Sequence, residues 1–146
     1  WFHLIQPHPL PEMMIGGCAR DYLHAKLGGW GSGGTAHIEA EALAEYERCI
    51  RIPGTAAAVC EDYRASAAVD LEHDRADRNA GRRLTMPLRV LWGADGVVGR
   101  CFDVPALWRA AADHVTGRAL PCGHYIAEEA PDALCDEFFG FIEETP

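Results

Sequence analysis

The hydrophobic pattern of this 146-residue chain changes near residue 84, and this change limits the fold more than any other feature. Before residue 84 the apolar residues recur at helical spacing, and no segment alternates as a half-buried strand does. After it, residues 88–92 form an apolar run ended by Gly93, which is typical of a parallel strand covered on both faces. The sequence therefore predicts an α/β fold with a helical first part.

Three further elements are expected after this strand: a helix over 103–115 with Asp103 as its N-cap, a short strand at 118–120, and a helix over 131–143. The last helix would turn an apolar face inward, made of Leu134, Phe138, Phe141 and Ile142. Two strands alone leave both sheet edges unpaired. We therefore expect 84–146 to be the end of a larger parallel sheet and 1–83 to be a helical cap region.

The cap region is expected to contain four helices, at 9–15, 19–27, 38–50 and 53–70, the last one opened by Pro53. The glycine-rich segment 28–34 is expected to be a loop. The mixed-charge run 72–78 is expected to be a solvated helix surface or a linker.

Composition excludes several classes of function. The net charge is −9, and one lysine stands against twelve arginines without a basic stripe, so nucleic acid is not an expected partner. No apolar run approaches the roughly 20 residues that span a bilayer, and no secretory leader opens the chain, so a cytoplasmic protein is expected. The six widely spaced cysteines are expected to be reduced and mostly buried. The histidines lack metal-ligand spacing, so neither a metal nor a cofactor is predicted.

His124 is the principal catalytic candidate. It follows an apolar segment in a Gly-His loop, and an acidic helix comes directly after it. Loops at the carboxyl ends of parallel strands meet in one crevice, and this is where a hydrolase holds its general base. A histidine in an ordinary surface turn is the competing interpretation.

Asp95 follows the strand at 88–92 and could orient the histidine as a triad acid, although an aspartate before Gly96 is equally typical of a simple turn. Ser32 stands one residue short of a Gly-x-Ser-x-Gly elbow, but the preceding residues read as helix rather than strand, so we reject it as a nucleophile. Tyr63 shares an inward helix face with Val59, and by itself this position indicates a core aromatic residue, as do Trp1 and Trp30.

These residues also stand in longer stretches that we compare together. The stretches are Trp-Phe-His-Leu-Ile-Gln-Pro at 1–7, Ala-Lys-Leu-Gly-Gly-Trp at 25–30, Cys-Glu-Asp-Tyr-Arg-Ala at 60–65, Asp-Leu-Glu-His-Asp at 70–74, Leu-Trp-Gly at 91–93, Cys-Gly-His-Tyr at 122–125 and Glu-Glu-Ala-Pro at 128–131. In order and spacing the chain resembles the haloacetate (fluoroacetate) dehalogenases over essentially its whole length. These enzymes are α/β hydrolases with a helical cap, so the resemblance implies an α/β-hydrolase fragment: the cap, then the last two parallel strands and helices of the core.

The resemblance implies a two-step reaction on a small haloacid anion. An aspartate displaces the halide to form an ester, and His124 then takes a proton from the water that hydrolyses it. Trp1 and Tyr63 would donate to the departing halide beside a histidine that precedes Trp1, and Trp30 matches a cap tryptophan near the substrate. The nucleophile and the carboxylate-binding arginines would lie upstream, and the family's triad acid sits earlier than Asp95. Whether the enzyme forms a homodimer stays open.

Three alternatives also stay open. An epoxide hydrolase shares the aspartyl-ester mechanism and would use Tyr63 to protonate the epoxide oxygen. A serine esterase of the same fold is the next enzyme candidate. A non-catalytic fragment would retain the end of the fold and expose hydrophobic surface.

Overall fold

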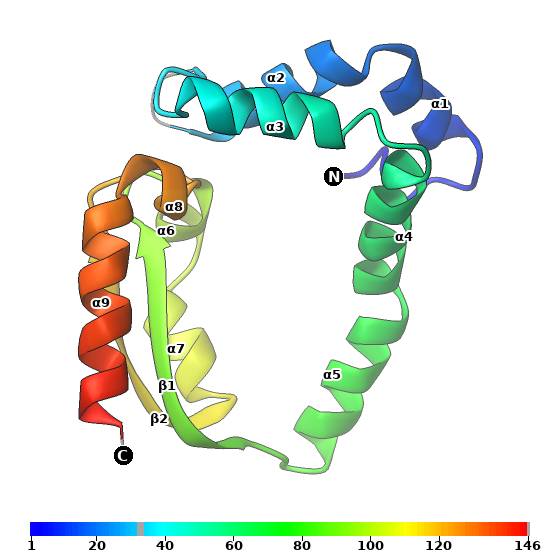
Figure 1. The fold of residues 1–146 in the computed structure, drawn as a ribbon. Coiled ribbons are helices and arrows are strands. Elements are labelled where there is room, and N and C mark those ends of the chain that lie inside the picture. The colour runs from blue at the N-terminus through cyan, green and yellow to red at the C-terminus, as the bar shows by residue number, and fades with distance from the viewer. Residues whose placement is uncertain (32–33, 146) are drawn as a thin grey trace. The chain divides into compact units, whose positions relative to one another are not determined.

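The structure is a computed structural model that describes residues 1–31 and 34–145. It divides into two compact units (Figure 1). The first unit combines Trp1–Lys26 with Ala40–Gly81, and the second combines Leu27–Glu39 with Arg82–Pro146. The boundary expected between 83 and 84 stays a prediction, and the segment that links α2 to α3 groups with the second unit.

The described part of the first unit is helical. Its helices are α1 (Leu10–Gly17), α2 (Ala19–Trp30, shared with the second unit), α3 (Ala40–Cys49), α4 (Thr55–Ala67) and α5 (Val69–Asn79). The charged run at 72–78 lies on α5 and is exposed, so its prediction as a solvated helix surface is confirmed.

Two helix boundaries differ from the sequence prediction. The predicted loop at 28–34 is wrong in its first part, because α2 continues to Trp30 through two glycines, which a helix tolerates at about 1 kcal/mol each. Pro53 does not open α4. Gly54 adopts a φ of 93° at the N-cap position, and the helix begins after it at Thr55.

The core of the first unit gathers around α1 and α4. Leu4, Ile15 and Cys60 are buried there. Partly buried neighbours pack against them: Tyr22, Ile50, Ala56, Val59 and Tyr63. Tyr63 therefore lies at the margin of this core, as its helix face predicts.

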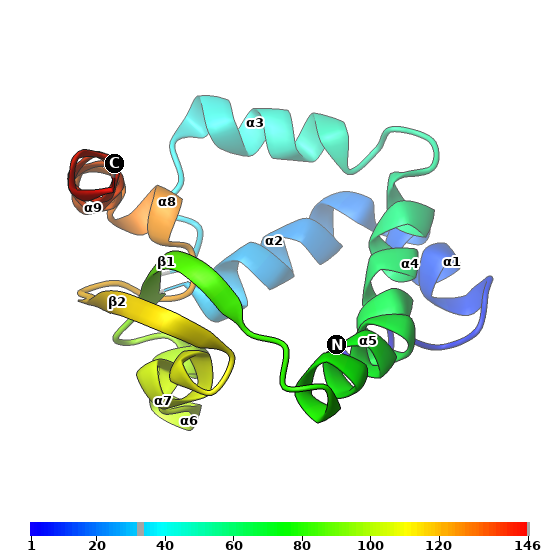
Figure 2. The ribbon, with the colours of Figure 1, turned by 90° about the horizontal axis from the view of Figure 1, so that it is seen from below.

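The second unit is a strand–helix–strand–helix arrangement. Its elements are β1 (Leu84–Gly93), α6 (Val97–Cys101), α7 (Val104–Arg109), β2 (Ala112–Leu120), α8 (Ile126–Glu129) and α9 (Pro131–Glu144). The strands pair in parallel, from Leu88 opposite Val115 to Gly93 opposite Leu120. Figure 2 shows the two strands side by side. The predicted α/β arrangement with two parallel strands is confirmed.

The predicted helix over 103–115 is wrong in its length. Asp103 caps it as expected, accepting from the Ala106 amide at 3.0 Å. The helix ends at Arg109, however, and β2 begins at Ala112. Arg83 caps this early end: its guanidinium donates to the carbonyls of Arg109, Ala110 and Ala112 at 2.9, 2.8 and 2.6 Å. An arginine that satisfies the final carbonyls removes the need for another helical turn.

Helix α9 covers one face of the strand pair, and α6 with α7 covers the other (Figures 1 and 2). The expected apolar face of α9 is only partly correct. Leu134 and Phe141 are half-buried, but Phe138 and Ile142 are 56% and 53% exposed.

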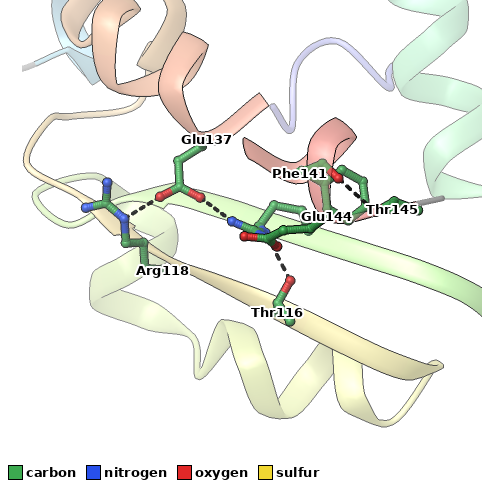
Figure 3. A network of polar contacts seen from close by, with 7 residues as sticks. Thr116, Arg118, Glu137, Phe141, Glu144 and Thr145 are labelled. Carbon is green, nitrogen blue, oxygen red and sulfur yellow. Dashed lines mark hydrogen bonds and ion pairs between the residues drawn. The ribbon is translucent and has the colours of Figure 1, made fainter. Parts of the chain in front are cut away.

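Polar contacts hold α9 to the strands instead (Figure 3). Glu137 accepts from Arg89 of β1 at 2.6 Å and from Arg118 of β2 at 2.5 Å. Arg89 also donates to Thr116 and to Glu144. These arginine hydrogen bonds hold the pKa of the Glu137 carboxyl below its usual value.

The cysteines are unpaired, but the expectation that most are buried is wrong. Cys60 and Cys122 are buried, whereas Cys18, Cys101 and Cys135 are exposed. In the part of the chain that the structure describes, no helix has the length and hydropathy needed to cross a bilayer. Residues 1–31 and 34–145 also contain no group of three or more His, Cys, Asp or Glu side chains placed to hold a metal ion.

Candidate active site

His124 lies in the tight loop that joins β2 to α8. Its side chain is exposed, while the preceding Gly123 is buried. The amides of Gly123 and Tyr125 donate to the two carboxylate oxygens of Glu129, at 2.8 and 3.0 Å. The amide of His124 itself donates to the Trp30 carbonyl at 3.2 Å. The loop backbone is thus fixed while the imidazole is exposed, and the role of His124 as a general base stays a prediction.

Aromatic rings surround His124 within the second unit. The Trp30 ring lies 5.3 Å from the imidazole, centroid to centroid, and the Tyr125 ring lies at 5.2 Å. Tyr125 is stacked in turn on His37, with an interplanar angle of 11°. Trp30, which the resemblance places near the substrate, is therefore a direct neighbour of His124. No sequence pattern predicts that His37 lies near this site, because it belongs to no recognised motif.

The Asp95 loop is joined to the His124 loop through the backbone. The Ala94 amide donates to the Leu120 carbonyl oxygen at 2.8 Å, and the Asp95 amide donates to the Cys122 carbonyl oxygen at 3.0 Å. A Cβ atom built on Gly93 would lie 1.7 Å from the Gly123 carbonyl oxygen, so only glycine permits this approach. This contact explains why a glycine stands at the end of the first predicted strand. The apolar pattern alone indicates only that the strand ends there.

The Asp95 side chain does not pair with the histidine. Within the described ranges, no hydrogen bond joins its carboxylate to His124. Asp95 instead lines a cavity of about 610 Å³ together with Trp30, Val97 and Arg100. Its assignment as the triad acid stays a prediction.

Trp1 and Tyr63 lie together in the first unit. Their ring centroids are 6.3 Å apart with an interplanar angle of 76°, an edge-to-face contact. Tyr63 is half-buried, whereas Trp1 is 54% exposed. Among the described residues, neither the Trp1 indole N–H nor the Tyr63 hydroxyl has a hydrogen-bond partner. The two side chains predicted to donate to one halide are thus neighbours whose donors are available.

Arg64 fixes the chain segment that carries Trp1, a role that sequence analysis missed. Its Nε and Nη2 atoms donate to the Gln6 carbonyl at 2.9 and 2.7 Å, and Nη2 lies 2.8 Å from Glu12 Oε1. Burial acts to raise the pKa of Glu12, but a backbone hydrogen bond and Arg64 hold it below its usual value. The signal was present, because Arg64 follows Tyr63 within the Cys-Glu-Asp-Tyr-Arg-Ala stretch.

Neither buried thiol is suited to act as the nucleophile. Burial raises the pKa of Cys60 and of Cys122, and nearby carboxylates raise both further. A thiol with a raised pKa is a poor nucleophile at neutral pH. Ser32, already rejected, lies outside the described residues, and the segment before it is helix α2 rather than a strand.

Comparisons with known proteins indicate the family of the chain. No family model matches the chain. A fluoroacetate dehalogenase from Burkholderia sp is 33% identical over 132 residues, which cover 90% of this chain and 43% of that protein. A soluble epoxide hydrolase from Corynebacterium sp. (strain C12) is 31% identical over 103 residues, covering 70% of this chain and 34% of that protein.

Solved structures give the fold. A crystal structure from Nostoc sp PCC 7120, provisionally described as an α/β hydrolase, is 45% identical with a TM-score of 0.91. The match covers 97% of this chain and 48% of that one. The chain thus spans about half the length, or less, of the proteins it matches.

Proposed function

Because the chain belongs to the α/β-hydrolase family, we propose that it carries the cap helices and the last core strands of a haloacetate dehalogenase. The substrate would be a small haloacetate anion such as fluoroacetate, and the product glycolate. The likeness to the Burkholderia fluoroacetate dehalogenase supports this choice of reaction.

The reaction would proceed through a covalent ester. An aspartate carboxylate, outside this chain, attacks the carbon that bears the halogen, and the carbon–halogen bond breaks as the ester bond forms. His124 then takes a proton from a water molecule while the water oxygen bonds to the ester carbonyl carbon. The ester C–O bond breaks, and glycolate leaves with the proton that the imidazolium returns. Asp95 could orient the imidazole only after its side chain turned toward it.

The single observation that carries the proposal is the contact between Trp1 and Tyr63. Fluoride is small and strongly hydrated, so its departure needs fixed donors where the negative charge develops. The indole N–H and the phenol O–H are two such donors on adjacent rings 6.3 Å apart, and neither is used by another group among the described residues. Arg64 holds the segment that carries Trp1 against α4, so the Trp1 and Tyr63 rings are held together before the substrate binds.

An epoxide hydrolase is the second candidate, supported by the likeness to the Corynebacterium enzyme. It would form the same ester but would use the Tyr63 hydroxyl as an acid toward the epoxide oxygen. Trp1 has no part in that reaction. A serine esterase would need a Gly-x-Ser-x-Gly elbow upstream of Trp1, and a non-catalytic fragment would show no turnover at all.

The test uses the full-length protein that contains this chain, with fluoroacetate and chloroacetate as substrates. We expect Tyr63→Phe to slow fluoride release by about 10²–10³-fold, the usual effect of removing one transition-state donor, and chloride release by less. His124→Ala should release one halide per active site and then stop, with the ester retained on the protein. Tyr46→Phe, on α3, is the matched control: it removes the same hydroxyl group away from Trp1, so it should not slow fluoride release more than chloride release.

Mass spectrometry of the intact protein detects the ester, and a fluoride electrode follows the halide. Equal slowing of the two halides in Tyr63→Phe would remove Tyr63 from the halide site. Continued turnover in His124→Ala would remove His124 from the mechanism. Hydrolysis of an epoxide without halide release from either acid would favour the epoxide hydrolase.

A further inference from the structure

We propose that Glu129 is a positioning residue for His124, because its carboxylate holds the two backbone amides that flank the histidine. This inference rests on the proposed function, since it assumes that His124 activates water for ester hydrolysis. It goes further by naming the group that sets where the imidazole stands.

The geometry of the loop supports this role. One Glu129 oxygen accepts from Gly123 at 2.8 Å and the other accepts from Tyr125 at 3.0 Å. With the His124 amide donating to Trp30, all three successive amides of the loop are occupied. Hydrogen bonds to an ionised acceptor are about twice as strong as neutral ones, so the two Glu129 bonds should restrain the loop more than the single bond to Trp30 does.

The position of Glu129 is itself fixed by local structure. It ends the single-turn helix α8, and its amide donates to the Tyr125 carbonyl at 2.8 Å. The Pro131 ring then begins α9, the helix held to both strands by Glu137. The carboxylate therefore belongs to a rigid element, and it restrains a loop that has no regular structure of its own.

A displaced loop would affect the two chemical steps differently. His124 acts only on the water that hydrolyses the ester, so the departure of the halide does not require its position. An error of 1 Å in a catalytic group can slow its step by about 10²-fold. Loss of the Glu129 contacts should therefore slow ester hydrolysis while halide release from the first step stays fast.

The test compares Glu129→Gln with Glu143→Gln in the full-length protein. Glutamine presents an oxygen to one amide but an N–H₂ group to the other, so at least one hydrogen bond is lost. Glu143 is an exposed residue of α9, and its replacement makes the same change of charge and shape. Rapid mixing with chloroacetate gives the size of the halide burst, which counts the folded active sites, and the decay rate of the ester at each site.

We expect Glu129→Gln to retain the burst and to slow ester decay by about 10–10²-fold, with Glu143→Gln unchanged. A proportional loss of both steps, or ester decay at the wild-type rate, would overturn the proposal. If Glu129→Gln does not fold, Glu129→Asp is measured in its place, because it keeps an acceptor-only carboxylate on a shorter side chain. An unchanged rate of ester decay in Glu129→Asp, together with raised amide exchange at Gly123 or Tyr125, would equally refute the role.

Amide hydrogen exchange separates this inference from the proposed reaction. Exchange at Gly123 or Tyr125, whichever amide then faces the glutamine N–H₂ group, should rise by about tenfold or more in Glu129→Gln, since a lost hydrogen bond of about 1.4 kcal/mol corresponds to that factor. Unchanged exchange would refute the positioning role whatever the enzyme catalyses. By contrast, a wild-type protein that forms no ester from either haloacetate would refute the proposed function, even with the exchange result as expected.

Discussion

Replacing Gly93 with alanine should displace the His124 loop more than any other single methyl group added near it. The new Cβ atom would lie 1.7 Å from the Gly123 oxygen and 2.7 Å from the Cys122 oxygen. Contacts under 3.0 Å are essentially never seen for Cβ atoms, so one strand end must move by at least about 1.3 Å. Both obstacles are backbone atoms, and they cannot rotate away as a side chain would.

The movement has two measurable effects. Overpacking against backbone costs about 3 kcal/mol of unfolding free energy, the upper end of the usual range. This corresponds to a fall of roughly 5–10 °C in the midpoint of thermal unfolding. Because His124 follows Gly123 directly, a shift above 1 Å should also lower kcat by about 10²-fold.

The assay measures thermal unfolding and steady-state halide release of the full-length protein, with Gly140→Ala as the control. A Cβ atom on Gly140 meets nothing within 4 Å, and alanine in a helix is favoured over glycine by about 0.5–1 kcal/mol. The control should therefore be neutral or slightly stabilised. The reasoning is refuted if Gly93→Ala unfolds at the wild-type temperature and keeps its kcat.

Two further predictions concern the first unit. Arg64→Ala should lower the rate of fluoride release by about tenfold or more, because the segment that carries Trp1 loses its contacts with α4. Arg48→Ala, an exposed arginine paired with Glu45, is the control. Equal rates of fluoride release in the two variants would contradict the role of Arg64. Glu47 accepts from His24 at 2.7 Å and from Arg20 at 3.0 Å, and these bonds hold its pKa at about 2, below the ordinary 4.5. Its contribution to stability should be complete above pH 4.5 and disappear as the pH falls towards about 2. Urea unfolding at several pH values should thus show Glu47→Gln approaching the wild type in acid, while Glu41→Gln, an exposed acid of the same helix, shows no such convergence.

Sequence patterns predicted those elements whose signal is local. The apolar run at 88–92 and the Gly-His loop after the second strand specify a parallel strand pair and its histidine, because burial and turn geometry act within a few residues. The helix over 103–115 was wrong in its second half, because its end depends on Arg83, twenty residues before the predicted helix begins. Glu129 was missed as an organising residue, because its partners are backbone amides that a pattern of side chains does not reveal. Arg64 stood in a stretch already singled out, but its contacts with Gln6 and Glu12 join segments far apart in the sequence.

The apolar face expected for α9 was correct only for Leu134 and Phe141. A helical repeat of apolar residues predicts packing, but it does not reveal that Glu137, beside Phe138, binds an arginine of each strand.

A carboxylate shared by two strands has a consequence for how the layers align. Hydrophobic contacts are non-directional, so by themselves they specify the position of a helix along a sheet less sharply than an ion pair does. Glu137 contacts Arg89 and Arg118 at once, and a slide by a single helical turn of about 5.4 Å would separate the largely buried Glu137 carboxylate from both arginines. The network therefore fixes the position of α9 along the strand direction. The His124 loop, which leads through α8 into α9, is therefore held at the same level along the strands.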